Sequence, residues 1–175
     1  MNTKRLTSLA MLIAVYIVLS ILTPVKVVNF KFTFEAFPIL VAAFLSGPVD
    51  GLIVGAVGSF IYQLLFSGYG ITPTTILWVL PHAASGLIVG LLSKSKNFDL
   101  NRLQIILFCI LSSLTVTSLN LLALYVDSRL YGYYSPALVF GNLLLKIFTG
   151  VILAVIYSAI LPKLLSYLKK LQERN

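Results

Sequence analysis

The stretch GYGITPTTILWVLPHAASG, residues 68–86, divides the longest uncharged segment of this chain into two parts. That segment runs over 51–93, which is too long for one membrane-spanning helix of about 20 apolar residues. Gly68, Gly70 and Thr72-Pro73 predict a turn followed by a new helix, with Thr at the N-cap and Pro in the first turn. We therefore expect one helix to end before Gly68 and another to begin near Pro73.

The composition indicates an integral membrane protein. Of 175 residues, 59% are hydrophobic and only 10% are charged, and the mean hydropathy is +1.00. A soluble domain carries about 25% charged residues. The net charge of +8 is explained by basic cytoplasmic loops more simply than by nucleic-acid binding. We expect the first apolar run to be a retained span, not a cleaved signal peptide.

Charged residues punctuate the chain and predict six helices. Most basic residues fall at the two ends of the chain or in 94–102, and these must share the cytoplasmic side. Both termini inside require an even number of crossings, so the short run 36–49 also spans. We predict an all-α integral membrane protein, a six-transmembrane-helix bundle with both termini cytoplasmic. It is a single transmembrane domain over 1–175, with helices near 5–23, 34–46, 49–66, 73–93, 103–126 and 136–165.

The outer half of the helix near 73–93 carries the first candidate binding residues. Thr74, Trp78, His82 and Ser85 follow helical spacing and share one face. The N-terminus of this helix faces outward, where its free N–H groups suit an anionic ligand. We interpret Trp78 as a stacking surface for a flat ring and His82 as a hydrogen-bonding group. The alternative is an interfacial aromatic residue beside a core histidine.

Other polar residues lie within the predicted spans. Lys146 is about ten residues into the last helix, and Asn142 and Thr149 share its face. Ionisable side chains at such depth are functional candidates, although a lysine can also snorkel along its stem. Asn120 and Gln63 lie near outer helix ends, where either could join helices. These groups gather in the outer half of the bilayer and predict an outward-facing pocket, not a pore.

The predicted outer loops, 24–33, 67–72 and 127–135, mix basic and aromatic residues. Lys26, Arg129 and Tyr125 are the candidates for holding a flat, anionic molecule. The alternative is an aromatic belt at the membrane interface.

Several kinds of site have no signal in the sequence. A phosphate-binding glycine loop is missing, so the chain is not expected to hydrolyse ATP. The sequence shows no pattern that is typical of a metal-binding cluster or of a catalytic triad. We expect a non-enzymatic chain without a metal or cofactor of its own. Ala10 and Ala14 form a small-xxx-small pair, as do Gly51/Gly55 and Gly86/Gly90, and such pairs let helices approach closely.

The chain resembles the S components of energy-coupling-factor (ECF) vitamin transporters, and most closely the folate-specific ones. The resemblance is carried by LAMLIAVYIVLS (9–20), FTFEAFPILVAAFLSGPVDGLIVG (32–55) and GITPTTILWVLPHAASGLIVGLL (70–92). It implies a bacterial plasma-membrane protein that binds folate in an outward pocket. It also implies docking, through Ala10 and Ala14, onto a transmembrane coupling subunit that carries two ATPase subunits. Trp78 would stack the pterin and Lys26 would lie near the glutamate end; Asn142 and Lys146 are chosen from depth and chemistry alone.

Three rival hypotheses stay open. The first keeps the family and changes the vitamin to a thiamine precursor or pantothenate. The second is a small intramembrane enzyme that uses His82 and Lys146. The third is a purely structural membrane subunit.

Overall fold

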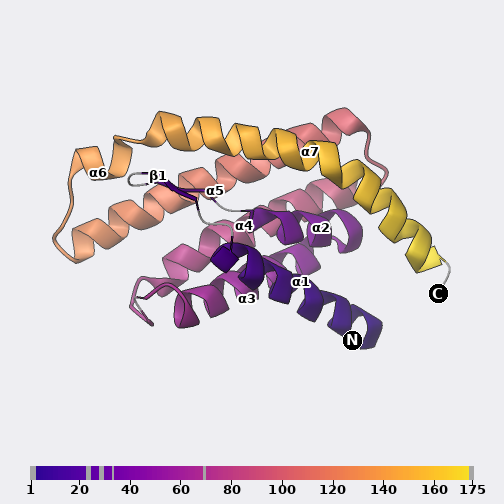
Figure 1. The fold of residues 1–175 in the computed structure, drawn as a ribbon, viewed down its shortest axis with the longest axis horizontal. Helices are drawn as coiled ribbons and strands as arrows, with labels where there is room; N and C mark the ends of the chain where they lie inside the picture. The colour runs from indigo at the N-terminus through magenta and orange to yellow at the C-terminus, as the bar shows by residue number, and fades with distance from the viewer. Residues whose placement is uncertain (1–2, 23–24, 28–29, 33, 69, 174–175) are drawn as a thin grey trace.

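The computed structural model describes the backbone of residues 3–22, 25–27, 30–32, 34–68 and 70–173, and the side chains of 3–22, 34–68 and 70–170. The elements are α1 (Thr3–Leu22), β1 (Val25–Val27), β2 (Phe30–Phe32), α2 (Ala36–Ser46), α3 (Pro48–Leu65), α4 (Thr75–Ser95), α5 (Arg102–Leu130), α6 (Pro136–Phe140) and α7 (Leu143–Glu173). The helices form a bundle elongated along the direction in which α5 and α7 run (Figure 1).

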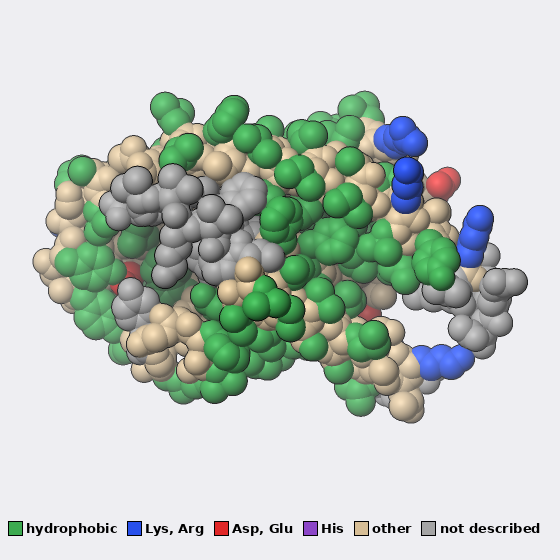
Figure 2. Space-filling view, viewed as in Figure 1, with side chains coloured by type: hydrophobic (Ala, Val, Ile, Leu, Met, Phe, Trp, Pro, Cys, Tyr) green, Lys and Arg blue, Asp and Glu red, His purple; other side chains and the backbone are tan. Residues whose placement is uncertain are grey.

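The structure confirms an all-α membrane bundle. Among the described residues, five helices or helix pairs are long and apolar enough to cross a membrane: Thr3–Leu22, Pro48–Leu65, Thr75–Ser95, Arg102–Leu130 and Pro136–Lys170. The start of α1 and the end of α7 lie at the same end of the molecule (Figure 1). Lys and Arg side chains gather at that end (Figure 2). This is the arrangement that cytoplasmic termini require, and the sidedness itself stays a prediction.

The segment predicted as a span over 34–46 forms only the 11-residue helix α2. At 1.5 Å per residue it covers about 16 Å, roughly half of the hydrocarbon core. It ends at Gly47, whose φ of 92° is a conformation that favours glycine. Residues Pro38 to Phe44 are all buried, so α2 lies inside the bundle, where α1, α3, α4 and α7 pack against it.

Two predicted segments differ in their local structure. The outer loop 24–33 contains an antiparallel hairpin of β1 and β2, in which Val25 pairs with Phe32 and Lys26 with Lys31. In both strands a lysine lies between two apolar residues. This alternation with a period of two is typical of a β-strand. The predicted helix 136–165 is divided into α6 and α7. The division falls at Gly141 and Asn142, two residues of low helix propensity.

Glycines bring α3 and α4 into close contact, as the small-xxx-small pairs predict. A Cβ added at Gly51 would lie 2.5 Å from the backbone oxygen of Gly86, and one at Gly55 would collide with the backbone oxygen of His82. Such contacts leave no space for a larger side chain. The α3–α4 pair therefore fixes where His82 lies relative to the rest of the bundle.

Candidate functional site

A cavity of about 410 Å³ lies among α1, α2, α3, α4, α5 and α7. Its volume is within the range of small-molecule sites. The residues whose chemistry matters below share one property, a polar or aromatic side chain. They are Tyr16, Glu35, Ser59, Tyr62, Gln63, Trp78, His82, Ser112, Ser113, Thr117, Asn120, Lys146, Thr149 and Tyr157.

Four of the eight predicted ligand-binding residues line this cavity: Trp78, His82, Asn120 and Lys146. They come from three helices, α4, α5 and α7, and are separated by up to 68 positions in the sequence. The structure therefore brings together residues that the sequence analysis selected by helix spacing, depth, side-chain chemistry and family resemblance. The side chain of Lys26, another predicted residue, lies outside the described residues.

Tyr125 and Arg129 are not among the lining residues. The Arg129 guanidinium lies 4.1 Å from the centroid of the Tyr134 ring and 5.5 Å from that of Tyr125. The two rings meet edge to face at 5.6 Å. This cation–π cluster joins the end of α5 to the following turn. Arg129 and Tyr125 thus contact each other outside the cavity lining, and their part in ligand binding stays a prediction.

Asn142 is also outside the cavity lining. It lies directly before α7, and its backbone oxygen accepts the first helical hydrogen bond from the Lys146 amide at 2.9 Å. Lys146 is one turn further along the helix and reaches the cavity. Asn142 and Lys146 are predicted to share a helix face, but only Lys146 lines the cavity.

The opening of α4 differs from the prediction. The helix begins at Thr75, so Thr72-Pro73 lies in the preceding turn, where the Thr72 amide donates to Thr75 Oγ1 at 2.8 Å. Thr74 is buried, and its hydroxyl donates to Asp127 of α5. The hydroxyl groups of Ser85 and Ser112 form a hydrogen bond of 2.6 Å. Of the predicted stripe, only Trp78 and His82 face the cavity.

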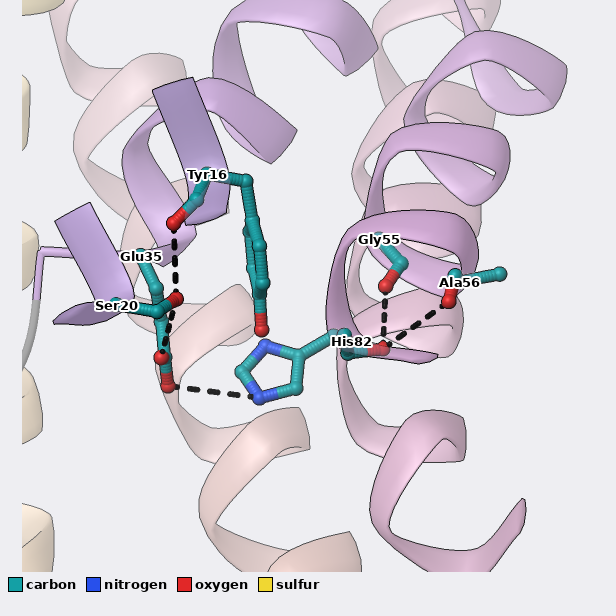
Figure 3. A network of polar contacts seen from close by, with 7 residues as sticks. Tyr16, Ser20, Glu35, Gly55, Ala56 and His82 are labelled. Carbon is teal, nitrogen blue, oxygen red and sulfur yellow. Dashed lines mark hydrogen bonds and ion pairs between the residues drawn. The ribbon is translucent and has the colours of Figure 1, made fainter. Parts of the chain in front are cut away.

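A polar network around Glu35, which the sequence analysis did not place in the site, includes the lining residues Tyr16, Glu35 and His82 (Figure 3). Glu35 directly precedes α2, and its Oε1 lies 3.6 Å from His82 Nε2. Ser20 donates to Glu35 Oε2 at 3.0 Å. The ring of Tyr16 meets the imidazole edge to face at 5.7 Å. The signal in the sequence was a lone acid between the hairpin and an apolar helix, but its inward direction is a tertiary feature.

Two lining groups keep unused binding capacity. Within the described part of the chain, no acidic side chain lies within ion-pair distance of Lys146. The Tyr157 hydroxyl is buried and has no hydrogen-bond partner among the described residues. A buried polar atom without a partner is costly, so each group favours a ligand that completes its contacts.

The cavity combines flat aromatic walls with a cation, a carboxylate and several hydroxyl and amide groups. Such a lining is chemically suited to a flat heterocycle whose edge carries hydrogen-bond donors and acceptors. Among the described residues, no group of three His, Cys, Asp or Glu side chains could hold a metal ion.

Comparison with known families decides what kind of protein this is. Residues 1–166 match the family described as the ECF-type riboflavin transporter, S component. The chain belongs to this family. It is therefore the S component of an ECF-type transporter, and the resemblance stated from the sequence is confirmed at that level.

Solved structures of other S components share the fold of this one. The S component of a bacterial ECF transporter is 26% identical with a TM-score of 0.73, and the match covers 97% of this chain and 99% of that chain. FolT bound with folic acid is 23% identical with a TM-score of 0.71, covering 91% and 93%. The S component for biotin from an ECF-type ABC transporter is 18% identical with a TM-score of 0.60, covering 91% and 94%. A search of curated proteins finds no match.

Proposed function

We propose that this S component captures folate in the cavity between α1 and α7. It then delivers folate inward when docked on a transmembrane coupling subunit that carries two ATPase subunits. The chain itself is a non-catalytic binding subunit. The observation that carries the choice of ligand is Lys146, a cation that lines the cavity without an acidic partner among the described residues. An ionisable group inside a membrane span needs a compensating charge, and an anionic vitamin supplies one.

The chemistry of folate matches the other lining groups. Its pterin ring is flat, and Trp78 and Tyr62 are aromatic lining residues that can stack on it. The ring edge carries N–H donors for the Glu35 carboxylate. The glutamate part carries carboxylates for Lys146, and hydrogen bonds between charged groups are the strong ones. FolT, whose structure was solved with folic acid, shares the fold of this chain, and this shared fold is the only support that the comparison gives to folate as the ligand.

Riboflavin is the second candidate, because the matching family is described as a riboflavin transporter. Its ring system is also flat and would stack on the same aromatic side chains. It has no charge, so Lys146 would donate a hydrogen bond to a neutral oxygen instead of pairing with an anion. The two candidates therefore differ in how much they depend on the charge of Lys146.

The docking surface that we propose is the face of α1 with Ala10 and Ala14. Both residues are exposed and lie four positions apart, so they share one face of the helix. Small side chains at this spacing let a second helix approach closely. This face supports contact with a helix of the coupling subunit.

The first test is the identity of the molecule that the purified chain retains. The chain is purified in mild detergent and denatured, and the released compounds are measured by absorbance and mass spectrometry. The proposal expects about one folate per chain. One flavin per chain would select the second candidate, and a chain that neither retains nor binds folate would contradict the proposed ligand.

A further inference from the structure

We infer that two hydroxyl side chains of α5, those of Ser113 and Thr117, select the vitamin by its tail. They donate hydrogen bonds to an acceptor-rich chain that extends from the flat ring. The inference rests on the proposed function, because it requires a cavity that holds a vitamin with a ring and a tail. Both residues line the cavity and lie four positions apart, so they share one face of α5. Neither belongs to the ligand-binding residues predicted from the sequence.

The hydroxyls of Ser113 and Thr117 are available to a ligand. A Ser or Thr hydroxyl inside a helix commonly donates to the backbone oxygen four residues earlier. Thr115, which does not line the cavity, makes such a bond at 2.8 Å, and so does the cavity-lining Thr149. Within the described part of the chain, Ser113 and Thr117 have no side-chain hydrogen bond. When a ligand displaces water from the cavity, each of these two hydroxyls needs an acceptor in the ligand.

The facing helix α7 leaves space for the two hydroxyls at Gly150. A Cβ added at Gly150 would collide with Ser113 Oγ and would lie 3.8 Å from Thr117 Oγ1. Lys146 precedes Gly150 by one turn of α7, and Thr117 follows Ser113 by one turn of α5. Since α5 and α7 run in opposite directions (Figure 1), Thr117 and Lys146 are displaced toward the same end of the cavity. The hydroxyls and the ammonium group therefore form one donor end.

The carboxylate of the cavity lies away from this donor end. Glu35 is the only acidic residue among the described lining residues. The residues beside it, Phe34 and Phe37, pack against the Tyr157 ring with centroids 6.2 Å and 5.7 Å apart. Tyr157 lies eleven residues beyond Lys146, which is about 16 Å along α7 at 1.5 Å per residue. The cavity thus has an acidic end for the N–H groups of a ring and a donor end for a tail.

The donor end selects a tail that is rich in hydrogen-bond acceptors. The Ser113 and Thr117 hydroxyls and the Lys146 ammonium group can all donate. The tail of folate ends in carboxylates and the tail of riboflavin carries hydroxyls, so both can accept. A ring without its tail leaves the donors without partners, which is costly. Carboxylates form the stronger, charge-assisted hydrogen bonds, so this end favours folate.

The test compares each vitamin with its ring alone in the detergent-purified, emptied chain. The two pairs are folate with 6-methylpterin and riboflavin with lumichrome, and the weaker ring compounds are measured by competition against the vitamin. Thr117→Val removes the hydroxyl at nearly constant volume. It should weaken binding of the vitamin about fivefold, the effect of one lost hydrogen bond, and leave binding of the ring within about twofold. Ser113→Ala/Thr117→Val should weaken vitamin binding about 25-fold.

Two matched variants separate the hydroxyl from its surroundings. Thr117→Ser keeps the hydroxyl and should bind the vitamin nearly as the wild type does. Thr115→Val is the same substitution on the same helix at a position that does not line the cavity, and it should leave both affinities unchanged. A thermal unfolding midpoint close to that of the wild type shows that each variant is folded.

The outcomes separate this inference from the proposed ligand. Equal loss for vitamin and ring in Thr117→Val would assign the residue to the shape of the wall and overturn the inference. Unchanged vitamin affinity in the double variant, or an equal loss in Thr115→Val, would overturn it as well. A wild-type chain that binds riboflavin and not folate would contradict only the proposed ligand, and the riboflavin pair then decides the inference. A chain that binds neither vitamin would overturn both.

Discussion

Lys146 is the residue on which the choice of ligand depends. It could be selected from the sequence because an isolated lysine deep in an apolar run is rare in membrane helices. Asn142 has the same predicted helix face, so spacing alone does not tell which of the two residues reaches the cavity. The structure separates them because α7 begins at Leu143, so Asn142 precedes the helix and only Lys146 reaches the cavity.

Replacing Lys146 by Met tests its charge with little change in volume. Folate affinity should fall about 10- to 100-fold, because a hydrogen bond to a charged group contributes about 1.5–3 kcal/mol. Lys146→Arg should recover part of the loss. Isothermal titration of detergent-purified protein measures both, and Lys163→Met, at an exposed position of the same helix, is the matched control. Unchanged folate affinity in Lys146→Met would contradict the role of this residue.

Glu35 is the residue that sequence reasoning missed most clearly. It lies just after the predicted outer loop 24–33, and the sequence does not say that the chain after the hairpin turns inward toward Ser20 and His82. Arg129, a cation predicted to meet the ligand, lies outside the cavity lining. Its stacking on Tyr134 is a contact across a turn that no spacing rule identifies.

Glu35→Gln should weaken folate binding about tenfold while the protein stays folded. The amide keeps the size of the side chain but replaces one charged acceptor for the ring N–H groups by a neutral one, and such hydrogen bonds are roughly half as strong. In a competition experiment between folate and an analogue that lacks the 2-amino group, Glu35→Gln should weaken the binding of folate only. Asp99→Asn, an exposed acid, is the control. Equal loss for both ligands would assign Glu35 to the shape of the wall instead.

At the scale of elements, the long helices could be predicted well and the short ones poorly. The bounds of α3 differ from the predicted 49–66 by one residue at each end. The predicted helix 103–126 ends before the charged residues near 127, yet α5 continues to Leu130. The length of an uncharged run indicates how much of the chain is buried in the membrane, but the helix itself can extend beyond the hydrocarbon core. The hairpin and the break at Gly141 depend on local backbone preferences that hydropathy does not detect.

Close packing of α3 against α4 gives a stability prediction. Gly55→Ala should lower stability by about 1–3 kcal/mol, because its Cβ would collide with the backbone oxygen of His82, which cannot move independently. Gly150→Ala is the control, since its Cβ would meet the side-chain oxygen of Ser113, which can rotate away. Thermal unfolding in detergent should show a lower midpoint for Gly55→Ala alone. Equal midpoints for the two variants would mean that α3 and α4 can separate at little cost.

At the scale of the whole molecule, composition alone determines the membrane class. The charge pattern predicts six helices, of which five are long and apolar enough to cross a membrane among the described residues. The cavity could be anticipated only as an outward cluster of polar groups. Its walls come from α1, α2, α3, α4, α5 and α7, and the aromatic residues Tyr16, Tyr62 and Tyr157 belong to it only through packing. The helix face around Ala10 is exposed in the isolated chain, as a docking surface must be.

Docking should be separable from vitamin binding. Ala10→Trp/Ala14→Trp should prevent co-purification with the coupling subunit and ATPases, because bulky side chains keep the facing helix away. Vitamin affinity should stay within about twofold, because neither alanine lines the cavity. Leu107→Trp, at an exposed position of α5, is the control. Loss of vitamin binding together with docking would show that the substitutions disrupt the bundle itself.

The most direct test of the central claim is a titration of folate and riboflavin into emptied wild-type chain, followed by the fluorescence of Trp78. This is the only tryptophan in the chain and it lines the cavity, so a flat ring stacked on it should quench its emission. We predict saturable quenching by folate at one molecule per chain, with tighter binding than riboflavin. Saturable quenching by riboflavin with none by folate would contradict the assignment of an anionic vitamin to this cavity.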